Sequence, residues 1–256
     1  MSSFSDVDAS LGVDRLISYL DVTDSFLAAM KAYVAVAARR AVPGGVVLDL
    51  GCGIGHDLVR LGDVGVRPVG LDASAAMLER ARLTAAGVPL VRADAARLPF
   101  GDGSLDGCRA ERILQHVGAP AVVVTEIARV LRPGAFVAVF EPDYATFRVD
   151  SDDPDDRSIP ARLLRVRHPG IGVDVARMLE VAGFAIDDIV TESSRGYSLD
   201  RRLPVDAVAV VHRAVDDGRF HAGHAARWIS EQRHRSALAT FRASWDKILV
   251  VAHRCS

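Results

Sequence analysis

The sequence predicts an α/β fold built on a doubly wound, largely parallel sheet. Short apolar runs alternate along the chain with stretches whose apolar residues recur at helical spacing. Strands separated by helices of this length imply right-handed crossovers between parallel strands. A glycine-rich turn also follows the first apolar run directly. Such a turn is typical of the ligand-binding end of these sheets.

We expect one domain over residues 1–256, beginning with a helical cap at 1–42. Apolar residues at helical spacing from about Val13 to Val42 predict two helices, separated near Asp21 to Asp24. Pro43 and the two glycines after it end the second helix.

Seven segments that are short, mostly apolar and bounded by turn residues are predicted strands. They are Val46 to Leu50, Arg67 to Leu71, Leu90 to Arg92, Leu105 to Ala110, Ala135 to Glu141, Ala185 to Glu192 and Lys247 to Ala252. Helices are expected at Asp57 to Leu61, Ser74 to Ala86, Pro120 to Leu131, Val173 to Ala182, Pro204 to Val215 and His221 to Ser236. The last two form a helical insertion, residues 195–240, ahead of the final strand. The aspartate-rich segment DYATFRVDSDDPDDRS after Pro142 is expected to be a solvated loop.

Charge and cysteine content narrow the class of partner. The chain has 31 Lys and Arg against 33 Asp and Glu, and its basic residues form no runs, which disfavours a nucleic-acid partner. Cys52, Cys108 and Cys255 are widely spaced and include no CxxC pair, so we expect a reduced, cytoplasmic setting and no metal site. No apolar run approaches membrane-spanning length, and no membrane partner is expected.

The segment VLDLGCGIGHD carries most of the functional information. A buried strand runs into Gly51, Gly53 and Gly55, and a helix follows at once. Glycines let the backbone turn sharply and let a ligand approach the amides without a Cβ in the way. A tight connection with no ligand is the alternative for such a turn taken alone.

Two aspartates favour the ligand-binding interpretation. Asp72 ends the second strand about twenty residues after the first glycine, where a carboxylate can accept hydrogen bonds from both ribose hydroxyls. Asp94, in VRADAARLPF, ends the third strand and can accept a hydrogen bond from an adenine amino group.

Together these segments resemble class I S-adenosylmethionine-dependent methyltransferases, which have a Rossmann-like fold, and especially their UbiE-like branch of small-molecule enzymes. The resemblance covers roughly Val46 to Asp143, and RASWDKILVVAHR is similar to the antiparallel strand that closes the family's seven-stranded sheet. It implies S-adenosylmethionine as cofactor and S-adenosylhomocysteine as product. The implied cofactor contacts are Asp49, Gly51, Cys52 and Gly53 at the methionine part, Asp72, Ala73 and Met77 at ribose or adenine, and Asp94 with Ala95 at the adenine edge.

A nicotinamide-dependent dehydrogenase is the main competitor, because it uses the same architecture. The glycines here read GxGxG rather than GxGxxG, and Asp94 is soon followed by Leu-Pro-Phe, as in the methyltransferases. The sequence also contains no Tyr-x-x-x-Lys pair. These features favour a methyltransferase.

The acceptor is expected in the crevice beyond the carboxyl ends of the strands. His116, in ERILQHV, is the candidate general base because imidazole titrates near working pH; helix capping or packing against the cofactor is the alternative. Glu111 and Arg112 are expected to contact the cofactor through their backbone, or else to form a buried ion pair.

Further candidates lie at the edge of this crevice. Asp143 and Tyr144 could orient an acceptor hydroxyl or amine, or could belong to a polar turn after the fifth strand. Tyr19, Lys31 and Tyr33 are candidates for the cofactor carboxylate or for a lid formed by the cap and the insertion.

We therefore expect a monomeric or homodimeric enzyme that methylates an O, N or C atom of a small metabolite, with specialised biosynthesis as its expected setting. A cofactor-bound cyclase or a non-methylating binding protein on the same fold is the alternative. Nucleic-acid methylation would usually show an Asn-Pro-Pro-Tyr-type segment after the fourth strand, where this chain has Ala-Glu-Arg-Ile.

Overall fold

The computed structural model describes residues 27–199 and 205–256. The first predicted helix and Tyr19 lie outside these residues. The described part of the expected cap consists of α2 (Ala28–Ala41), which ends just before the Pro43 turn as predicted.

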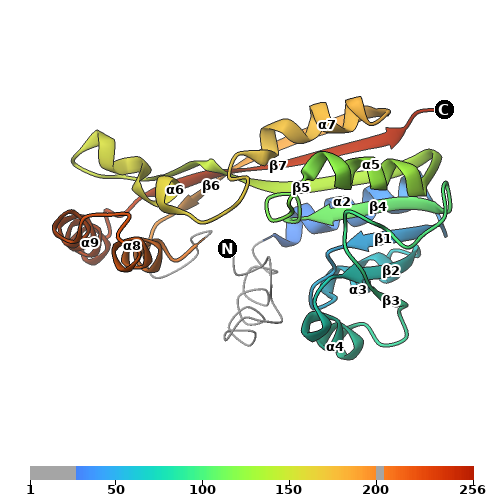
Figure 1. The fold of residues 1–256 in the computed structure, drawn as a ribbon, viewed down its shortest axis with the longest axis horizontal. Coiled ribbons are helices and arrows are strands. Elements are labelled where there is room, and N and C mark those ends of the chain that lie inside the picture. Colours follow the sequence, from blue (N-terminus) through green and yellow to red (C-terminus); the bar gives the residue numbers. More distant parts are fainter. Residues whose placement is uncertain (1–26, 200–204) are drawn as a thin grey trace.

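The strands form one seven-stranded sheet in the order β3-β2-β1-β4-β5-β7-β6 (Figure 1). Their bounds are β1 (Val46–Leu50), β2 (Arg67–Asp72), β3 (Leu90–Arg92), β4 (Leu105–Glu111), β5 (Leu131–Val149), β6 (Phe184–Gly196) and β7 (Ala243–Arg254). The five neighbouring strands β3, β2, β1, β4 and β5 are parallel to one another, whereas β7 is antiparallel to both of its neighbours. The predicted doubly wound sheet with an antiparallel last strand is confirmed.

Helices cover both faces of this sheet. In chain order, the helices that follow α2 are α3 (His56–Asp63), α4 (Ala75–Thr84), α5 (Pro120–Val130), α6 (Ile159–Leu163), α7 (Val175–Val181), α8 (Ala207–Asp216) and α9 (Ala222–Ala237), with short 3-10 turns η1 (Pro154–Ser158) and η2 (Ile171–Asp174). Most of the predicted helices therefore occur within a few residues of their expected bounds.

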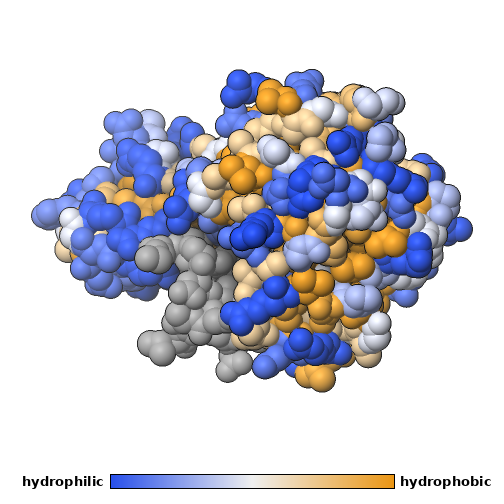
Figure 2. All heavy atoms as spheres, turned by 45° about the vertical axis from the view of Figure 1, so that its right-hand side comes forward, coloured by the Kyte–Doolittle hydropathy of each residue, from blue (hydrophilic) through white to orange (hydrophobic). Residues whose placement is uncertain are grey.

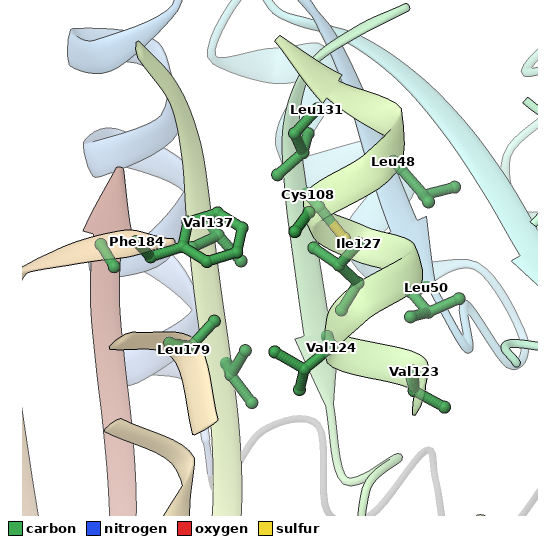
Figure 3. Close-up of a cluster of buried hydrophobic side chains, with 14 of the residues drawn as sticks. Leu48, Leu50, Cys108, Val123, Val124, Ile127, Leu131, Val137, Leu179 and Phe184 are labelled. Atoms are coloured by element: carbon green, nitrogen blue, oxygen red, sulfur yellow. The ribbon is translucent and has the colours of Figure 1, made fainter. Parts of the chain in front are cut away.

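Side-chain alternation in the strands creates two separate cores. Leu48 of β1, Cys108 of β4 and Val137 of β5 pack beneath α5 and α7 on one face (Figure 3). Val47 and Phe136, one residue out of phase, pack beneath α2 on the other face. Because successive side chains of a strand point to opposite faces, Asp49 lies on the α2 face, next to Val47 in the alternation.

The aspartate-rich segment differs from its prediction. β5 does not end near Glu141 but continues to Val149, and Phe147 and Val149 are fully buried. Their alternation with exposed Arg148 is a strand pattern, which the acidic residues after Val149 obscured. Only the stretch from Asp150 into η1 has the expected loop character.

The continued part of β5 belongs to a separate group of buried residues, which we call the second hydrophobic unit and which lies apart from the two cores of the central sheet. Phe147 contacts Trp245 of β7 edge to face, and both pack with buried residues of α6, α8 and α9, including Trp228. This unit lies beyond the carboxyl ends of β1 to β4 (Figure 1). The expected helical insertion is thus seated on extended strands rather than on the central sheet.

Figure 2 shows hydrophilic residues interspersed with small apolar areas over one face of the molecule. Among the residues described, none of the helices has the length and apolar character needed to cross a membrane.

Candidate functional site

The topology brings most of the predicted site residues to one edge of the sheet. The carboxyl ends of β3, β2, β1, β4 and β5 are neighbours there, because these five strands are parallel and adjacent. Asp72 is the last residue of β2, and Asp94, Gly51 and His116 follow the ends of β3, β1 and β4. The edge includes the reversal of strand order between β1 and β4, where open α/β sheets bind ligands.

The glycine turn has the backbone geometry that only glycine adopts readily. Gly51, Gly53 and Gly55 all have positive φ, at 71°, 51° and 87°. Gly51 has a further constraint, because a Cβ there would lie 1.9 Å from Cδ1 of Ile113. Ile113, in the segment after β4, therefore covers Gly51 closely, a contact that the sequence did not suggest.

Asp72 links the glycine turn to the start of α4. Its Oδ2 accepts a hydrogen bond from Gly53 N at 2.9 Å and its Oδ1 one from Ser74 N at 2.9 Å. Ser74 in turn caps α4 by accepting from the amide of Met77. Met77 is buried and Ala73 is exposed. A carboxylate has about four acceptor positions, so Asp72 can accept further donors from a ligand.

Asp94 and Ala95 lie in the turn after β3. The Asp94 carboxylate is exposed, and its Oδ1 accepts from Ala96 N at 2.9 Å. Ala95 packs against the main core, and Cys52, from the glycine turn, packs with Leu58. Asp94 thus presents a carboxylate to solvent at this edge.

Beneath the glycine turn lies a buried cluster of charges, which sequence reasoning missed. Arg109 of β4, 6 % exposed, contacts Asp49 Oδ1 at 2.6 Å and Asp57 Oδ2 at 3.0 Å, and also pairs with Glu111. Lys31 of α2 contacts Asp57 at 2.5 Å and Glu111 at 3.1 Å. We call these five residues the buried charge cluster. It joins α2, α3, β1 and β4 to one another.

Asp49 is the most deeply buried member of the buried charge cluster. It is 0 % exposed, and its Oδ2 has no hydrogen-bond partner within residues 27–199 and 205–256. Burial raises its pKa to about 6, although Arg109 opposes this shift. By contrast, Arg109 and Lys31 hold the pKa of Asp57 below its ordinary value despite its burial. Asp49 therefore offers a buried acceptor oxygen to any nearby donor.

Glu111 and Arg112 form the ion pair that was the alternative interpretation. Arg112 Nε lies 3.3 Å from Glu111 Oε1, and Lys31 and Arg109 lower the pKa of Glu111 below its ordinary value. Arg112 has φ of +55°, which is strained for a residue other than glycine. Its amide donates to Phe140 O, in the neighbouring strand β5, at 2.9 Å.

His116 has a different electrostatic environment from the one expected. Burial and the charge of Arg112 lower its pKa to about 4. Its imidazole is thus neutral at pH 7 and does not titrate near working pH. A neutral ring can still accept a hydrogen bond or a proton, as a weak base.

Asp143 and Tyr144 do not lie in a polar turn. Both are inside β5, at 4 % and 6 % exposure, and Asp143 Oδ1 accepts from Ala145 N at 3.0 Å. Burial raises the pKa of Asp143. The alternative of a polar turn after the fifth strand was therefore wrong, because β5 continues past this point.

Lys31 and Tyr33 both have partners among the described residues. Lys31 belongs to the buried charge cluster beneath the glycine turn, whereas the Tyr33 hydroxyl donates to Asp188 Oδ2, in β6, at 2.6 Å. Within the described part of the chain, no group of three or more His, Cys, Asp or Glu side chains is placed to hold a metal ion.

Comparison with known proteins agrees with this geometry. Residues 48–139, which run from β1 into β5, match the family described as methyltransferase domain. The chain is 33 % identical over 129 residues to a demethylmenaquinone methyltransferase of Renibacterium salmoninarum, covering 49 % of this chain and 54 % of that protein. Residues 48–139 therefore match a methyltransferase domain, in agreement with the resemblance of the sequence to class I S-adenosylmethionine-dependent methyltransferases.

Two further similarities extend beyond the core of the methyltransferase domain. A 37.1 kDa protein of transposon TN4556 in Streptomyces fradiae is 36 % identical over 227 residues, which cover 83 % of this chain and 65 % of that protein. The solved structure of an S-adenosylmethionine-dependent methyltransferase from Mesorhizobium loti has a TM-score of 0.54 at 22 % identity, covering 86 % of this chain and 96 % of that one. The chain thus spans between about half and two thirds of these curated relatives.

Proposed function

We propose that this chain binds S-adenosylmethionine along the carboxyl edge of β3, β2, β1 and β4 and transfers its methyl group to a small molecule. The observation that carries the proposal is the positive-φ glycine turn, hydrogen-bonded through Gly53 to Asp72 at the end of the neighbouring strand. This pairing of bare backbone with a carboxylate suits a nucleoside ligand.

The residues present fit the cofactor. The cofactor's ammonium could donate to Asp49 Oδ2, the buried oxygen that no described residue satisfies. Asp72 would accept the ribose hydroxyls while keeping its bonds to Gly53 and Ser74. Exposed Asp94, with Ala95 beside it, would hold the adenine edge. We infer that Gly51, Cys52, Ala73 and Met77 contact the cofactor through the same turns.

The chain's contribution to the reaction would be mainly alignment. When bound, the cofactor supplies a methyl group already activated on a sulfonium, so the protein has to orient the acceptor, exclude water and receive a proton where the acceptor loses one. His116, neutral at pH 7, is the group we assign to accept that hydrogen bond or proton. The backbone of Glu111 and Arg112 would border the cofactor, and Asp143 and Tyr144 would support the acceptor side from within β5.

We further propose that residues 195–240 form a lid over the acceptor. α8 packs on α6, α9 packs on α8, and their buried residues share one cluster with the far part of β5, beyond the ends of the central strands (Figure 1). Access from that side would then depend on the second hydrophobic unit. We propose a small metabolite of specialised biosynthesis as the acceptor, and the chain's net charge of -2 gives no reason to expect a nucleic acid.

Calorimetric titration with S-adenosylmethionine and S-adenosylhomocysteine tests cofactor binding directly. Asp72→Ala should weaken binding at least about tenfold, or 1.4 kcal/mol, because it removes the ribose acceptor. Asp63→Ala, at an exposed carboxylate on α3, is the matched control and should bind like wild type. Equal affinity in the Asp72→Ala and Asp63→Ala proteins, or no binding by wild type, would count against the proposal.

Product mass then separates methyl transfer from its alternative. Incubation with a panel of small acceptors should give products heavier by one methyl group, together with S-adenosylhomocysteine. A cofactor-dependent product of unchanged mass would instead indicate a cyclase on the same fold.

A further inference from the structure

The segment after β4, residues 112–117, is held from β5 by an unusual buried side chain. Glu141, at 0 % exposure, accepts hydrogen bonds through Oε1 from the amides of Ile113 at 2.8 Å and Leu114 at 2.7 Å. Arg112 N donates to Phe140 O, the residue before Glu141, at 2.9 Å. One short stretch of β5 therefore binds three consecutive amides of this segment.

The same segment contacts both sides of the proposed site. Ile113 covers Gly51 so closely that a Cβ on that glycine would lie 1.9 Å away. His116 follows one turn later, and its amide donates to Ile113 O at 2.9 Å. Ile113 thus borders the cofactor side while His116 belongs to the acceptor side, and the amide held by Glu141 is that of Ile113 itself.

A third contact reaches the segment from the stretch that follows α6. His168 N donates to Gln115 O at 3.2 Å, and His168 Nε2 lies 3.1 Å from Val117 O. The strained backbone of Arg112, with φ of +55°, must be imposed by such surroundings. The segment is therefore positioned by tertiary contacts rather than by its own preference.

We propose that Glu141 is a positioning residue that fixes residues 112–116 against the glycine turn, and so sets the methionine side of the cofactor site and the place of His116. This inference rests on the proposed function. It assigns Glu141 no contact with the cofactor or the acceptor.

The second oxygen of Glu141 indicates which substitution should be tolerated. Oε2 has no hydrogen-bond partner in the part of the chain that the structure describes, and burial raises the pKa of the carboxyl to about 8. A neutral side chain that keeps one acceptor oxygen can therefore hold both amides. Glu141→Gln preserves that oxygen, whereas Glu141→Leu removes it at similar volume.

We call the two hydrogen bonds from the amides of Ile113 and Leu114 to Glu141 the clamp. Amide hydrogen exchange measured by NMR tests it without any ligand. In Glu141→Leu, the amides of Ile113 and Leu114 should exchange at least tenfold faster than in wild type, while Glu141→Gln should restore slow exchange. Asp106 provides the matched control, because its Oδ2 accepts from Val46 N at 2.6 Å at the start of β4, the opposite edge of the sheet. Asp106→Leu should speed exchange at Val46 only.

Calorimetry with S-adenosylhomocysteine tests the consequence for the site. Glu141→Leu should bind at least tenfold more weakly than wild type, whereas Glu141→Gln and Asp106→Leu should stay within threefold of it. Ile113→Ala, which keeps the clamp but uncovers Gly51, should weaken binding to a similar extent and remains informative if Glu141→Leu does not fold.

Three results would overturn the inference. They are unchanged exchange at Ile113 and Leu114 in Glu141→Leu, equal weakening of S-adenosylhomocysteine binding by Asp106→Leu, and wild-type affinity in Ile113→Ala. If wild type itself bound no S-adenosylhomocysteine, the proposed function would fail, and the exchange measurement would still decide whether Glu141 holds the segment.

Discussion

Replacing Arg109 with methionine would test the buried charge cluster most directly. The guanidinium is 6 % exposed and contacts three carboxylates, of Asp49, Asp57 and Glu111. Removing one partner of a buried ion pair costs about 3–5 kcal/mol, because the remaining charge stays buried without compensation. Lys31 still neutralises Asp57 and Glu111, so we expect the lower part of that range, about 3 kcal/mol.

Part of the stability lost in Arg109→Met should come from the Asp49 carboxyl. Without Arg109 its carboxyl would be protonated at pH 7, since burial raises its pKa to about 6 even beside the cation. An asparagine has no such protonation cost. Protonating a carboxyl whose unfolded pKa is about 3.9 costs up to about 4 kcal/mol at pH 7, so the double variant Asp49→Asn/Arg109→Met should be more stable than Arg109→Met by at least about 1 kcal/mol.

Urea unfolding with linear extrapolation would measure both differences. Arg132→Met is the control, because Arg132 pairs with Asp106 at 2.8 Å while 56 % exposed, and such surface pairs contribute about 1 kcal/mol or less. A loss for Arg109→Met no larger than for Arg132→Met would refute the reasoning that the cluster is a single buried unit.

Three further predictions concern the edge of the sheet. Gly51→Ala should lower the free energy of unfolding in urea by about 2–4 kcal/mol, because a φ of +71° is strained for alanine and its Cβ would clash with Ile113. If adding Ile113→Ala recovers none of this stability, the steric part of the reasoning is wrong. Burial raises the pKa of Glu141 above its unfolded value, to about 8, so its stabilising protonated form is lost as pH rises. Between pH 5 and 8, the free energy of unfolding of wild type should then fall by up to about 4 kcal/mol relative to that of Glu141→Gln. The same pH dependence of stability in both proteins would contradict this. His116→Asn should lower the rate of methyl transfer at least tenfold with unchanged cofactor affinity. The pH profile of the wild-type rate should show no ionisation of His116 between about pH 5.5 and 8, because its pKa is about 4. An ionisation near pH 6.5 that disappears in the variant would show that the imidazole titrates normally.

The sequence predicted those parts of the molecule that depend on neighbouring residues. β1 and β3 have the expected bounds, since each is a short run closed by turn residues. The glycine turn, Asp72 and Asp94 follow from their places at strand ends, which the parallel topology then brings to one edge. Local pattern and topology together were sufficient for the proposed cofactor side.

Contacts between distant residues were beyond such reasoning. Lys31, Asp57 and Arg109 come from α2, α3 and β4, and nothing in their local sequence shows that they meet. A partial signal existed, because Asp49 interrupts the otherwise apolar β1 and Arg109 lies in the middle of β4, at positions that share one face with Val47. Charged residues are rarely buried unless paired, so two such positions in adjacent strands indicate a buried pair.

The acceptor side was harder to predict for the same physical reason. His116 was expected to titrate near neutrality, but its pKa depends on burial and on Arg112, whose backbone is held by β5. Glu141 looked like the end of a strand, yet its Oε1 binds two amides of the segment that carries His116. A change in the acceptor side can therefore come from substitutions in β5 or near His168 that alter no residue of the crevice. Selectivity for the acceptor should consequently be sought in these supports as well as in the groups that face the substrate.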